Sequence, residues 1–365
     1  MGAARTLHGA HIAVAPGGLA SLGTHLRTRW PSHRVALVAD ATVARLHGAA
    51  ARASVGASVG GDVPLLTFPA GEASKTRATW AALTDELITL GYGRDTVLVA
   101  LGGGVTTDLG GFVAATYLRG IPLALVPSSL LAMIDAAIGG KTGVDTPAGK
   151  NLVGAFHHPG LVLIDPTLLA TLPVPERRAG LAEAIKHGVI ADAAYLDAIR
   201  ADLPYLLEPD AIVPEAAERL VTRSVAIKAD LVAQDERETG LREALNVGHT
   251  LGHALEQVTG YGVPHGEAVA IGMVLEARVA EAIGHARAGL ADRIADACHA
   301  AGLPTALPPG TDAAALVAAT HADKKSRGGA VRYSLPRDIG TIATDSRGFL
   351  VAVPDADVRR ILTQL

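Results

Sequence analysis

Three histidines and two glutamates lie close together in one part of the sequence. They occur in the run Asn246-x-x-His249-x-x-x-His253-x-x-Glu256 and in His265-Gly266-Glu267, which follows it. Two histidines four residues apart share one face of a helix, with roughly 5–6 Å between their β-carbons, so both imidazoles can point into one cleft. Two neutral imidazoles and a carboxylate can hold a divalent metal and leave one position open for substrate. The run therefore predicts a metal site.

This run differs from the protease motif H-E-x-x-H at one decisive position. Thr250 follows His249, where the protease motif has the glutamate that acts as general base. The sequence therefore argues against a metalloprotease. A single histidine often has a purely structural role, but three histidines in one short stretch beside the polar Asn246 favour the metal site.

A second group of chemically informative residues is rich in glycine. The apolar run Thr96–Ala100 is followed, after Leu101, by Gly102-Gly103-Gly104-Val105-Thr106-Thr107-Asp108-Leu109-Gly110-Gly111. Glycine lets the backbone approach a phosphate closely, and the amides at a helix start can donate to it. Because the run is not the usual dinucleotide motif G-x-G-x-x-G, a tight turn without a ligand is the alternative. Asp40, which ends an earlier apolar run, can accept hydrogen bonds from ribose hydroxyls and supports a dinucleotide site.

Cations and carboxylates also occur within otherwise apolar sequence. Long basic side chains usually lie on the solvated surface, but several of these stand between Ala, Ile, Val and Gly, which favours a small ligand with several negative charges. For Lys324-Lys325, before a glycine-rich turn, the surface interpretation is strongest. The residues are Arg119, Asp135, Lys141, Lys150-Asn151, Glu183-x-x-Lys186, Lys228, Arg242 and Asp323-Lys324-Lys325.

The pattern of apolar residues predicts the elements that position these groups. Up to residue 177, short aliphatic runs alternate with helix-length stretches, which indicates βα units and a parallel sheet whose strand ends bind the ligand. After that the spacing is helical, including one stretch from about Leu241 to Val258. Short strands are expected in Val331–Leu335 and Gly348–Val353, followed by a closing helix after Pro354. We therefore expect a Rossmann-like α/β domain over 1–177 and a mainly α-helical domain over 178–365.

Composition excludes several classes of protein. The chain has 365 residues, of which 49% are hydrophobic and 19% charged, which is typical of a globular protein and not of a disordered one. The formal charge of −4 is spread without a basic stripe, so neither nucleic acid nor a membrane is an expected partner, and no apolar run approaches the roughly 18 residues of a span. The single cysteine, Cys298, is consistent with a reducing cytoplasm.

Seven motifs in the same order together resemble the 3-dehydroquinate synthase family of sugar phosphate cyclases. The similarity extends from about residue 35 to residue 340, and the seven in register are far more specific than any one alone. The motifs are Gly102–Asp108, Tyr117–Gly120, Ile134-Asp135 through Gly143, Gly149–Asn151, Gly180–Lys186, Leu245–His253 and His265–Val269.

The resemblance implies an activity and its cofactors. Family members convert 3-deoxy-D-arabino-heptulosonate 7-phosphate to 3-dehydroquinate and phosphate, a step of the shikimate pathway to aromatic amino acids. NAD oxidises the C4 hydroxyl, phosphate is eliminated, the hydride returns, and the ring reopens and closes as a carbocycle. The family works as a cytoplasmic homodimer with NAD and a divalent metal, zinc or cobalt, so the same is expected here.

The resemblance also assigns roles to individual residues. Asp135, Lys186, Asn246 and His253 would line the reacting hydroxyls, Lys228 and Arg242 would hold the carboxylate, and Glu183, His249 and His265 would bind the metal. Lys141, Asn151, Lys324 and Arg119 of the neighbouring subunit would hold the phosphate. NAD would contact Asp40, Glu72, Lys75, Gly103, Gly104, Asp108, Ser128, Ser129, Lys150 and Thr171.

Some positions depart from the family pattern, and other activities fit the same fold. Thr106-Thr107 replaces an aliphatic residue and glycine, which bears on the fit of the NAD pyrophosphate; Ser128-Ser129, Ala136-Ala137 and Asp145 also differ from the usual residues. Cyclases acting on sedoheptulose 7-phosphate, as 2-epi-5-epi-valiolone synthase does, or on glucose 6-phosphate need no carboxylate clamp, so Lys228 with Arg242 favours the dehydroquinate reaction. An aminodehydroquinate synthase, a polyol dehydrogenase and a catalytically silent binding subunit are the remaining alternatives.

Overall fold

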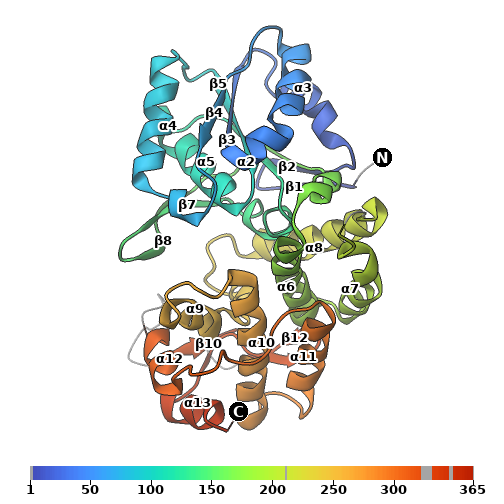
Figure 1. Cartoon of the computed structure of the whole chain (residues 1–365), viewed down its shortest axis with the longest axis vertical. Coiled ribbons are helices and arrows are strands. Elements are labelled where there is room, and N and C mark those ends of the chain that lie inside the picture. The colour runs from blue at the N-terminus through green and yellow to red at the C-terminus, as the bar shows by residue number, and fades with distance from the viewer. Residues whose placement is uncertain (1–2, 210–211, 322–330, 345–347, 365) are drawn as a thin grey trace. The chain divides into compact units, whose positions relative to one another are not determined.

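The computed structural model describes residues 3–209, 212–321, 331–344 and 348–364 (Figure 1). Contacts divide the chain into two compact units. The first comprises Met1–Pro173 with Pro209–Val225, and the second comprises Val174–Glu208 with Ala226–Leu365. The predicted α/β and mainly helical architectures are confirmed. The boundary at residue 177 remains a prediction, and it falls inside helix α6, Val174–Ala191.

The first unit is built on a parallel sheet. In its described residues, seven strands form one sheet in the order β1-β2-β9-β6-β5-β3-β4, with β1 antiparallel to β2 and the other pairs parallel. The central strands β9, β6 and β5 are buried along their whole length, as in parallel sheets that are covered on both faces. The strands are β1 (Ala3–Leu7), β2 (Ala10–Val14), β3 (Arg34–Asp40), β4 (Leu65–Phe68), β5 (Thr96–Gly102), β6 (Leu123–Pro127) and β9 (Leu161–Ile164).

Helices and one hairpin surround this sheet (Figure 1). The antiparallel hairpin of β7 (Lys141–Thr146) and β8 (Gly149–Phe156) is attached to the segment before α4, because the Asp145 amide donates to the Lys75 carbonyl at 2.8 Å. The helices are α1 (Leu22–Arg29), α2 (Ala41–Val43), α3 (Ala49–Val59), α4 (Arg77–Thr89) and α5 (Gly104–Thr116), with the short helices η3 (Glu72–Ser74), η4 (Tyr117–Arg119), η5 (Ala132–Ala136) and η6 (Pro166–Thr171).

The second unit is mainly helical. Its short strands pair as β10 with β13 and β11 with β12. Helix α8 continues from the first unit into the second. The elements are α6 (Val174–Ala191), α7 (Ala193–Leu206), α8 (Pro214–Gln234), η7 (Leu241–Asn246), α9 (His249–Val258), α10 (His265–Ala282), α11 (Leu290–Ala300), α12 (Ala313–Thr320), β10 (Arg332–Tyr333), β11 (Pro336–Asp338), β12 (Thr341–Ile342), β13 (Val351–Ala352) and α13 (Asp355–Leu362).

The sequence predicted one helical stretch from about Leu241 to Val258, and as a continuous helix this prediction was wrong. The 3-10 helix η7 ends at Asn246, and Gly248 has φ +81°, a left-handed conformation that interrupts the helix before α9 begins at His249. Glycine is required at this turn because a β-carbon would lie 2.6 Å from Met273 Cγ and 2.7 Å from the Val269 carbonyl oxygen. The closing strands β10 and β13 are also shorter than predicted.

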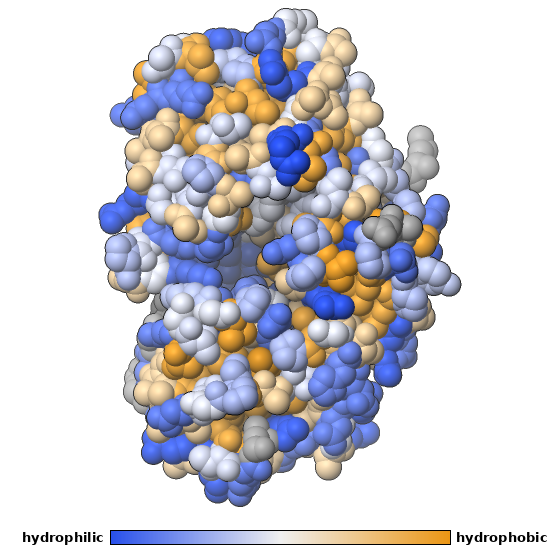
Figure 2. Space-filling model, viewed as in Figure 1, coloured by the Kyte–Doolittle hydropathy of each residue, from blue (hydrophilic) through white to orange (hydrophobic). Residues whose placement is uncertain are grey.

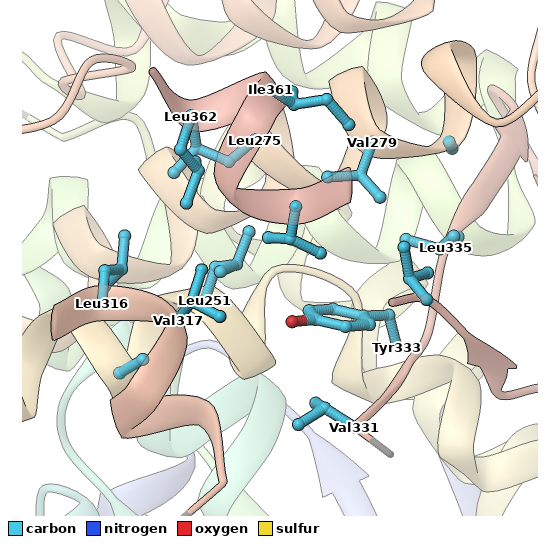
Figure 3. Packing of buried hydrophobic residues seen from close by; sticks show 14 of the residues in the cluster. Leu251, Leu275, Val279, Leu316, Val317, Val331, Tyr333, Leu335, Ile361 and Leu362 are labelled. Atoms are coloured by element: carbon cyan, nitrogen blue, oxygen red, sulfur yellow. The ribbon is translucent and has the colours of Figure 1, made fainter. Parts of the chain in front are cut away.

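Small residues bring the helices of the second unit close together. A β-carbon on Gly272 of α10 would lie 2.0 Å from the Gly248 carbonyl oxygen, and one on Gly266 would lie 2.4 Å from Ala179 of α6. The buried side chains of Leu251, Leu275, Tyr333 and their neighbours pack behind these contacts (Figure 3). At these two glycines α10 therefore meets α6 and the turn before α9 without an intervening side chain, which fixes the relative positions of their polar residues.

None of the described helices is both long enough and apolar enough to cross a bilayer. On the face shown in Figure 2, hydrophobic residues form separate patches among hydrophilic ones.

Candidate active site

A carboxylate and two imidazoles meet inside the second unit. Glu183, on α6, is fully buried, and its Oε1 lies 3.4 Å from His249 Nε2 at the start of α9 and 3.7 Å from His265 Nε2 at the start of α10. One ligand atom of each residue lies within 4.8 Å of the others. Neither carboxylate oxygen of Glu183 accepts a hydrogen bond of ordinary geometry. A buried carboxylate that faces two ring nitrogens is a donor set that can hold a divalent metal, and its chemistry fits zinc or cobalt.

Both imidazoles are oriented from behind. His249 Nδ1 lies 3.2 Å from the Val247 carbonyl oxygen, and His265 Nδ1 lies 3.2 Å from Glu256 Oε2. When Nδ1 carries the proton and donates to these oxygens, the Nε2 lone pair of each ring is directed toward Glu183. Contacts of this kind on the far side of metal-binding histidines fix the orientation of the ring and raise the affinity for the metal.

Charges around the cluster keep Glu183 ionised. Burial opposes ionisation, but the ion pair with Lys186 on the same helix, together with His249, holds the pKa of the Glu183 carboxyl well below its ordinary value. Burial and the Lys186 charge lower the pKa of His249 to about 4. Against the effect of burial, the carboxylates of Glu183 and Glu256 raise the pKa of His265 to about 9 in the metal-free protein, so a metal that binds Nε2 has to displace a proton.

His253 adds a third imidazole to the cluster. Its ring lies edge-on to His249, with 5.2 Å between centroids, and is stacked on His265 at 5.9 Å. Spacing alone placed His249 and His253 on one helix face and left the carboxylate open; the structure brings donor atoms of Glu183, His249 and His265 together. Glu256 lies behind His265, and with His253 and His265 it forms a second group of adjacent donor atoms.

The loop before α9 holds Arg242 and Asn246 through acidic residues that the sequence reading did not single out. Asp235 Oδ2 accepts from the amides of Gly240 at 2.8 Å and Arg242 at 3.1 Å. Glu238, with φ +57°, accepts from Asn246 Nδ2 at 2.6 Å. The signal that could have revealed them is the density of acidic residues in the segment Asp235–Glu238, shortly before Gly240.

The glycine turn of the first unit opens toward the start of α5. Gly103 is the N-cap of α5 and supplies no side-chain cap, so the first amides of the helix are available to an anion. A β-carbon on Gly102 would lie 2.3 Å from Thr106 Oγ1, so packing requires that glycine. On Gly103 or Gly104 the nearest atoms would lie 3.4 and 3.6 Å away, belonging to Ser129 and Ala136. Those two positions leave room for a ligand, which fits a pyrophosphate.

Lys75 joins two residues assigned to different parts of the site. Its Nζ lies 2.6 Å from Asp108 Oδ2 and 2.6 Å from Asn151 Oδ1. Asn151 has φ +54°, and its amide donates to Asp145 Oδ1 at 2.8 Å, so the hairpin holds it in a strained conformation. Burial raises the pKa of Glu72 beside this group, although Lys75 and Lys150 oppose the shift.

The Asp40 carboxylate makes hydrogen bonds within the protein that the sequence did not suggest. Its Oδ1 accepts from the amides of Thr42 at 2.9 Å and Val43 at 3.0 Å, and Thr106 Oγ1 lies 3.4 Å from Oδ2. Thr107 is buried, and its hydroxyl donates to the Gly104 carbonyl at 3.0 Å within α5. The polar atom of Thr107 is therefore directed at its own helix.

The other predicted residues lie on identified elements of each unit. In the first unit, Thr171 Oγ1 lies 2.9 Å from His47 Nε2. Lys324 lies outside the described residues. The remaining positions are Arg119 in η4, Ser128 and Ser129 after β6, Asp135 in η5, Lys141 at the start of β7, Lys150 on β8 and Lys228 on α8.

Family models match both units in sequence. A model described as 3-dehydroquinate synthase N-terminal matches residues 65–179, and one described as 3-dehydroquinate synthase C-terminal matches residues 180–326. The chain is 49% identical over 330 residues to a 3-dehydroquinate synthase of Pelobacter propionicus, covering 90% of each protein. It is 47% identical over 354 residues to that of a Synechococcus species, covering 96% of this chain and 94% of the relative.

Solved structures of related cyclases have a similar fold. A 2-epi-5-epi-valiolone synthase from Streptomyces hygroscopicus with NAD+ and Zn2+ bound superposes with a TM-score of 0.86 at 30% identity, covering 100% of this chain and 98% of that chain. A 2-deoxy-scyllo-inosose synthase complexed with carbaglucose-6-phosphate, NAD+ and Co2+ gives a TM-score of 0.88 at 25% identity, covering 99% and 100%.

Proposed function

The chain belongs to the 3-dehydroquinate synthase family, and on that basis we propose that it converts 3-deoxy-D-arabino-heptulosonate 7-phosphate to 3-dehydroquinate and phosphate. The reaction is a phosphate-eliminating carbon–oxygen lyase reaction in the cytoplasm. The family relatives cover nearly the whole chain, so the proposal applies to the complete reaction and not to a single domain.

Glu183, His249 and His265 are the proposed ligands of a zinc or cobalt ion. The buried, ionised Glu183 and the two oriented Nε2 atoms support this assignment. The bound metal supplies a Lewis acid for the hydroxyl that is oxidised. Lys186, ion-paired with Glu183, and His253, beside both imidazoles, are the proposed contacts to the reacting hydroxyls, together with Asp135 and Asn246.

The glycine turn and the Lys75 group are the proposed NAD site. Gly103 and Gly104 leave room at the start of α5, and Asp108 is fixed by Lys75. NAD supplies a reversible hydride acceptor, and the protein supplies orientation and electrostatics. Asp40, Glu72, Ser128, Ser129, Lys150 and Thr171 complete the proposed set. The inward-facing hydroxyl of Thr107 argues that this substitution leaves the pyrophosphate space open.

The choice of substrate rests on one observation, the burial of two cations in the second unit. Arg242 is 2% exposed and Lys228 is 6% exposed. Arg242 Nη1 donates to the Glu236 carbonyl at 2.6 Å, which helps to orient the guanidinium. Arg and Lys side chains bind carboxylates through charge-assisted hydrogen bonds. The heptulosonate phosphate carries a carboxylate, whereas sedoheptulose 7-phosphate and glucose 6-phosphate do not, so the two cations favour the first substrate. Lys141, Asn151 and Lys324 are the proposed phosphate contacts.

A homodimer with Arg119 acting on the neighbouring site completes the proposal. Leu118 and Arg119 have φ +49° and +68°, so two successive residues are held in the left-handed region, and Leu118 is exposed. Backbone strain of this kind is common at functional positions. Mixing Arg119→Ala with Arg242→Ala protein should restore activity, because one site of each mixed dimer is then intact. No recovery from confirmed mixed dimers would contradict the exchange.

Phosphate release tests the proposed reaction. Purified protein with catalytic NAD and zinc or cobalt is offered the heptulosonate phosphate, sedoheptulose 7-phosphate and glucose 6-phosphate in parallel. We expect release from the first alone, without accumulation of NADH. Release from one of the others would instead support a sister cyclase, and the aminated substrate analogue tests the aminodehydroquinate alternative. Net NADH production from polyols would support a dehydrogenase, whereas protein that binds neither metal nor NAD would support a silent subunit.

A further inference from the structure

Helix α10 carries a buried carboxylate to which none of the roles above has been given. Glu276 is 0% exposed and stands within the apolar run Met273-Val274-Leu275-Glu276-Ala277. Its neighbour Leu275 belongs to the apolar cluster of Figure 3. A carboxylate in such surroundings is costly unless it is well hydrogen-bonded, so its contacts indicate its role.

Glu276 caps the helix that begins with His249. Its Oε2 accepts from the Gly248 amide at 2.6 Å, and its Oε1 accepts from the Leu251 amide at 3.1 Å. Helix starts usually obtain this acceptor from a Ser, Thr, Asp or Asn side chain at the N-cap. Here the N-cap is Gly248, at φ +81° and too close to Met273 for any side chain, so the acceptor has to come from another helix.

The contact with Gly248 also acts on the ring of His249. The Gly248 N–H and the Val247 carbonyl belong to the same peptide unit, which is planar and turns as one rigid body. The N–H of this unit is held by Glu276, and its carbonyl oxygen lies 3.2 Å from His249 Nδ1. Any rotation of the peptide that breaks the first contact also displaces the second.

We propose that Glu276 is a positioning residue for the metal site, which acts through the Val247–Gly248 peptide to fix the tautomer and orientation of His249. The inference rests on the proposed metal ligands. In this relay, the Glu276 carboxylate holds the Val247–Gly248 peptide, and the peptide holds His249. For the second histidine, His265, the Glu256 carboxylate makes the corresponding contact directly. Removing a group of this kind behind a ligand typically lowers metal affinity about 10–100-fold.

The chain offers a matched control on the same helix. Glu281 Oε1 accepts from the Ala291 amide at 2.8 Å, at the start of α11. That helix also has a left-handed glycine N-cap, Gly289 at φ +87°, without a side-chain cap. Since α11 carries none of the proposed metal ligands, Glu281→Gln makes the same chemical change at a similar cap without touching the relay.

The test compares wild-type protein, Glu276→Gln and Glu281→Gln after removal of metal, with folding verified by circular dichroism and by NAD binding. Zinc affinity is measured by competition with a chelator, and ligand geometry by the absorption spectrum of the cobalt form. We expect Glu276→Gln to bind zinc at least about 10-fold more weakly with an altered cobalt spectrum. Glu281→Gln should match wild type in both.

A second comparison separates the relay from a direct effect of charge. In a His249→Ala background, Glu276→Gln should cause no further loss of zinc affinity, because the relay has lost its end point. An equal loss in that background, or wild-type affinity and spectrum for Glu276→Gln alone, would overturn the proposal. So would a Glu276→Gln protein that fails to fold with zinc present while Glu281→Gln folds, since the role would then be structural. Wild-type protein that binds no metal would instead overturn the metal site itself.

Discussion

Lys75 donates from Nζ to Asp108 Oδ2 at 2.6 Å, and both side chains are mostly enclosed in the first unit. The same ammonium group reaches Asn151 Oδ1 at 2.6 Å. Burial opposes the charge, but Asp108 raises the pKa of Lys75, so the lysine is a cation. One buried cation thus links a residue assigned to NAD with a residue assigned to the substrate phosphate.

Replacing Lys75 by Met should destabilise the first unit and weaken NAD binding. The substitution leaves the Asp108 carboxylate without this partner, and breaking a buried pair typically costs about 3–5 kcal/mol. Urea unfolding and NAD titration measure the two effects. Arg52→Met is the control, since the Arg52–Asp62 pair is exposed and should contribute no more than about 1 kcal/mol. Equal losses in both variants would contradict the role of Lys75.

Asp235→Asn should weaken substrate binding by loosening the loop that carries Arg242. Although burial opposes it, hydrogen bonds from the amides of Thr239, Gly240 and Arg242 lower the pKa of Asp235. An asparagine would direct its side-chain NH2 group toward some of these backbone N–H donors, and these hydrogen bonds would be lost. We expect KM for the substrate to rise more than kcat falls. Asp312→Asn, which makes the same change at the N-cap of α12, should leave KM unchanged.

The same residue predicts a pH effect. Because its pKa is lowered on folding, Asp235 contributes stability above its unfolded pKa of about 3.9, and this contribution is lost as the pH falls through the lowered value. Acid unfolding between about pH 5 and 2 should therefore differ between wild type and Asp235→Asn. Identical acid transitions in the two proteins would show that these hydrogen bonds add no stability.

The sequence predicted what depends on residue type and regular spacing. Alternating apolar runs indicated the parallel sheet, which is confirmed. The glycine run was expected at a strand end and lies there, before α5, while its contact with NAD stays a prediction. Spacing also brought His249 and His253 to one helix. The grouping of Glu183 with His249 and His265 came from the family resemblance. The three residues lie on separate helices, and sequence spacing does not show which helices pack against each other.

Long-range contacts and special backbone conformations were not predictable in this way. The apolar period continues through Gly248, so it did not reveal the left-handed turn that ends η7. Lys75 meets Asn151 only because the β7–β8 hairpin folds back onto the segment before α4. The sequence pattern did not single out Glu276, because its contact with the Gly248 amide depends on how α10 packs against the start of α9.

Glu256→Gln should lower metal affinity through His265. The glutamine oxygen can still accept a hydrogen bond, but the negative charge that raises the pKa of His265 is lost, and with it the basicity of the ring. Chelator competition should show zinc binding weakened about 10-fold or more. Glu281→Gln is again a suitable control. Unchanged zinc affinity for Glu256→Gln would mean that His265 is oriented by other contacts.

Arg242→Ala should mainly affect binding of the substrate carboxylate. Removing one partner of a desolvated charge pair costs on the order of 2–5 kcal/mol, so KM should rise strongly. Metal content and NAD binding should remain at wild-type levels. Arg237→Ala removes an exposed guanidinium from the same loop and should change KM little. Wild-type kinetics for Arg242→Ala would refute the proposed clamp.

Gly248→Ala should be far more damaging than Gly289→Ala, although both replace a left-handed glycine at a helix N-cap. Gly289 has φ +87° and nothing within 4 Å of an added β-carbon, so only backbone strain of about 1–2 kcal/mol is expected. At Gly248 the β-carbon would also meet Met273 Cγ at 2.6 Å and the Val269 carbonyl oxygen at 2.7 Å. Such overpacking typically adds about 1–3 kcal/mol.

The two variants should differ in metal binding as well as in stability. Relief of the Gly248 clash has to move α9 away from α10, and His249 begins α9 while His265 begins α10. The cobalt spectrum of Gly248→Ala should therefore change, and that of Gly289→Ala should not. Urea unfolding of the metal-free proteins measures stability separately. If both variants lose the same stability and keep the wild-type spectrum, the close approach of α9 and α10 at Gly248 has no part in holding the two histidines together.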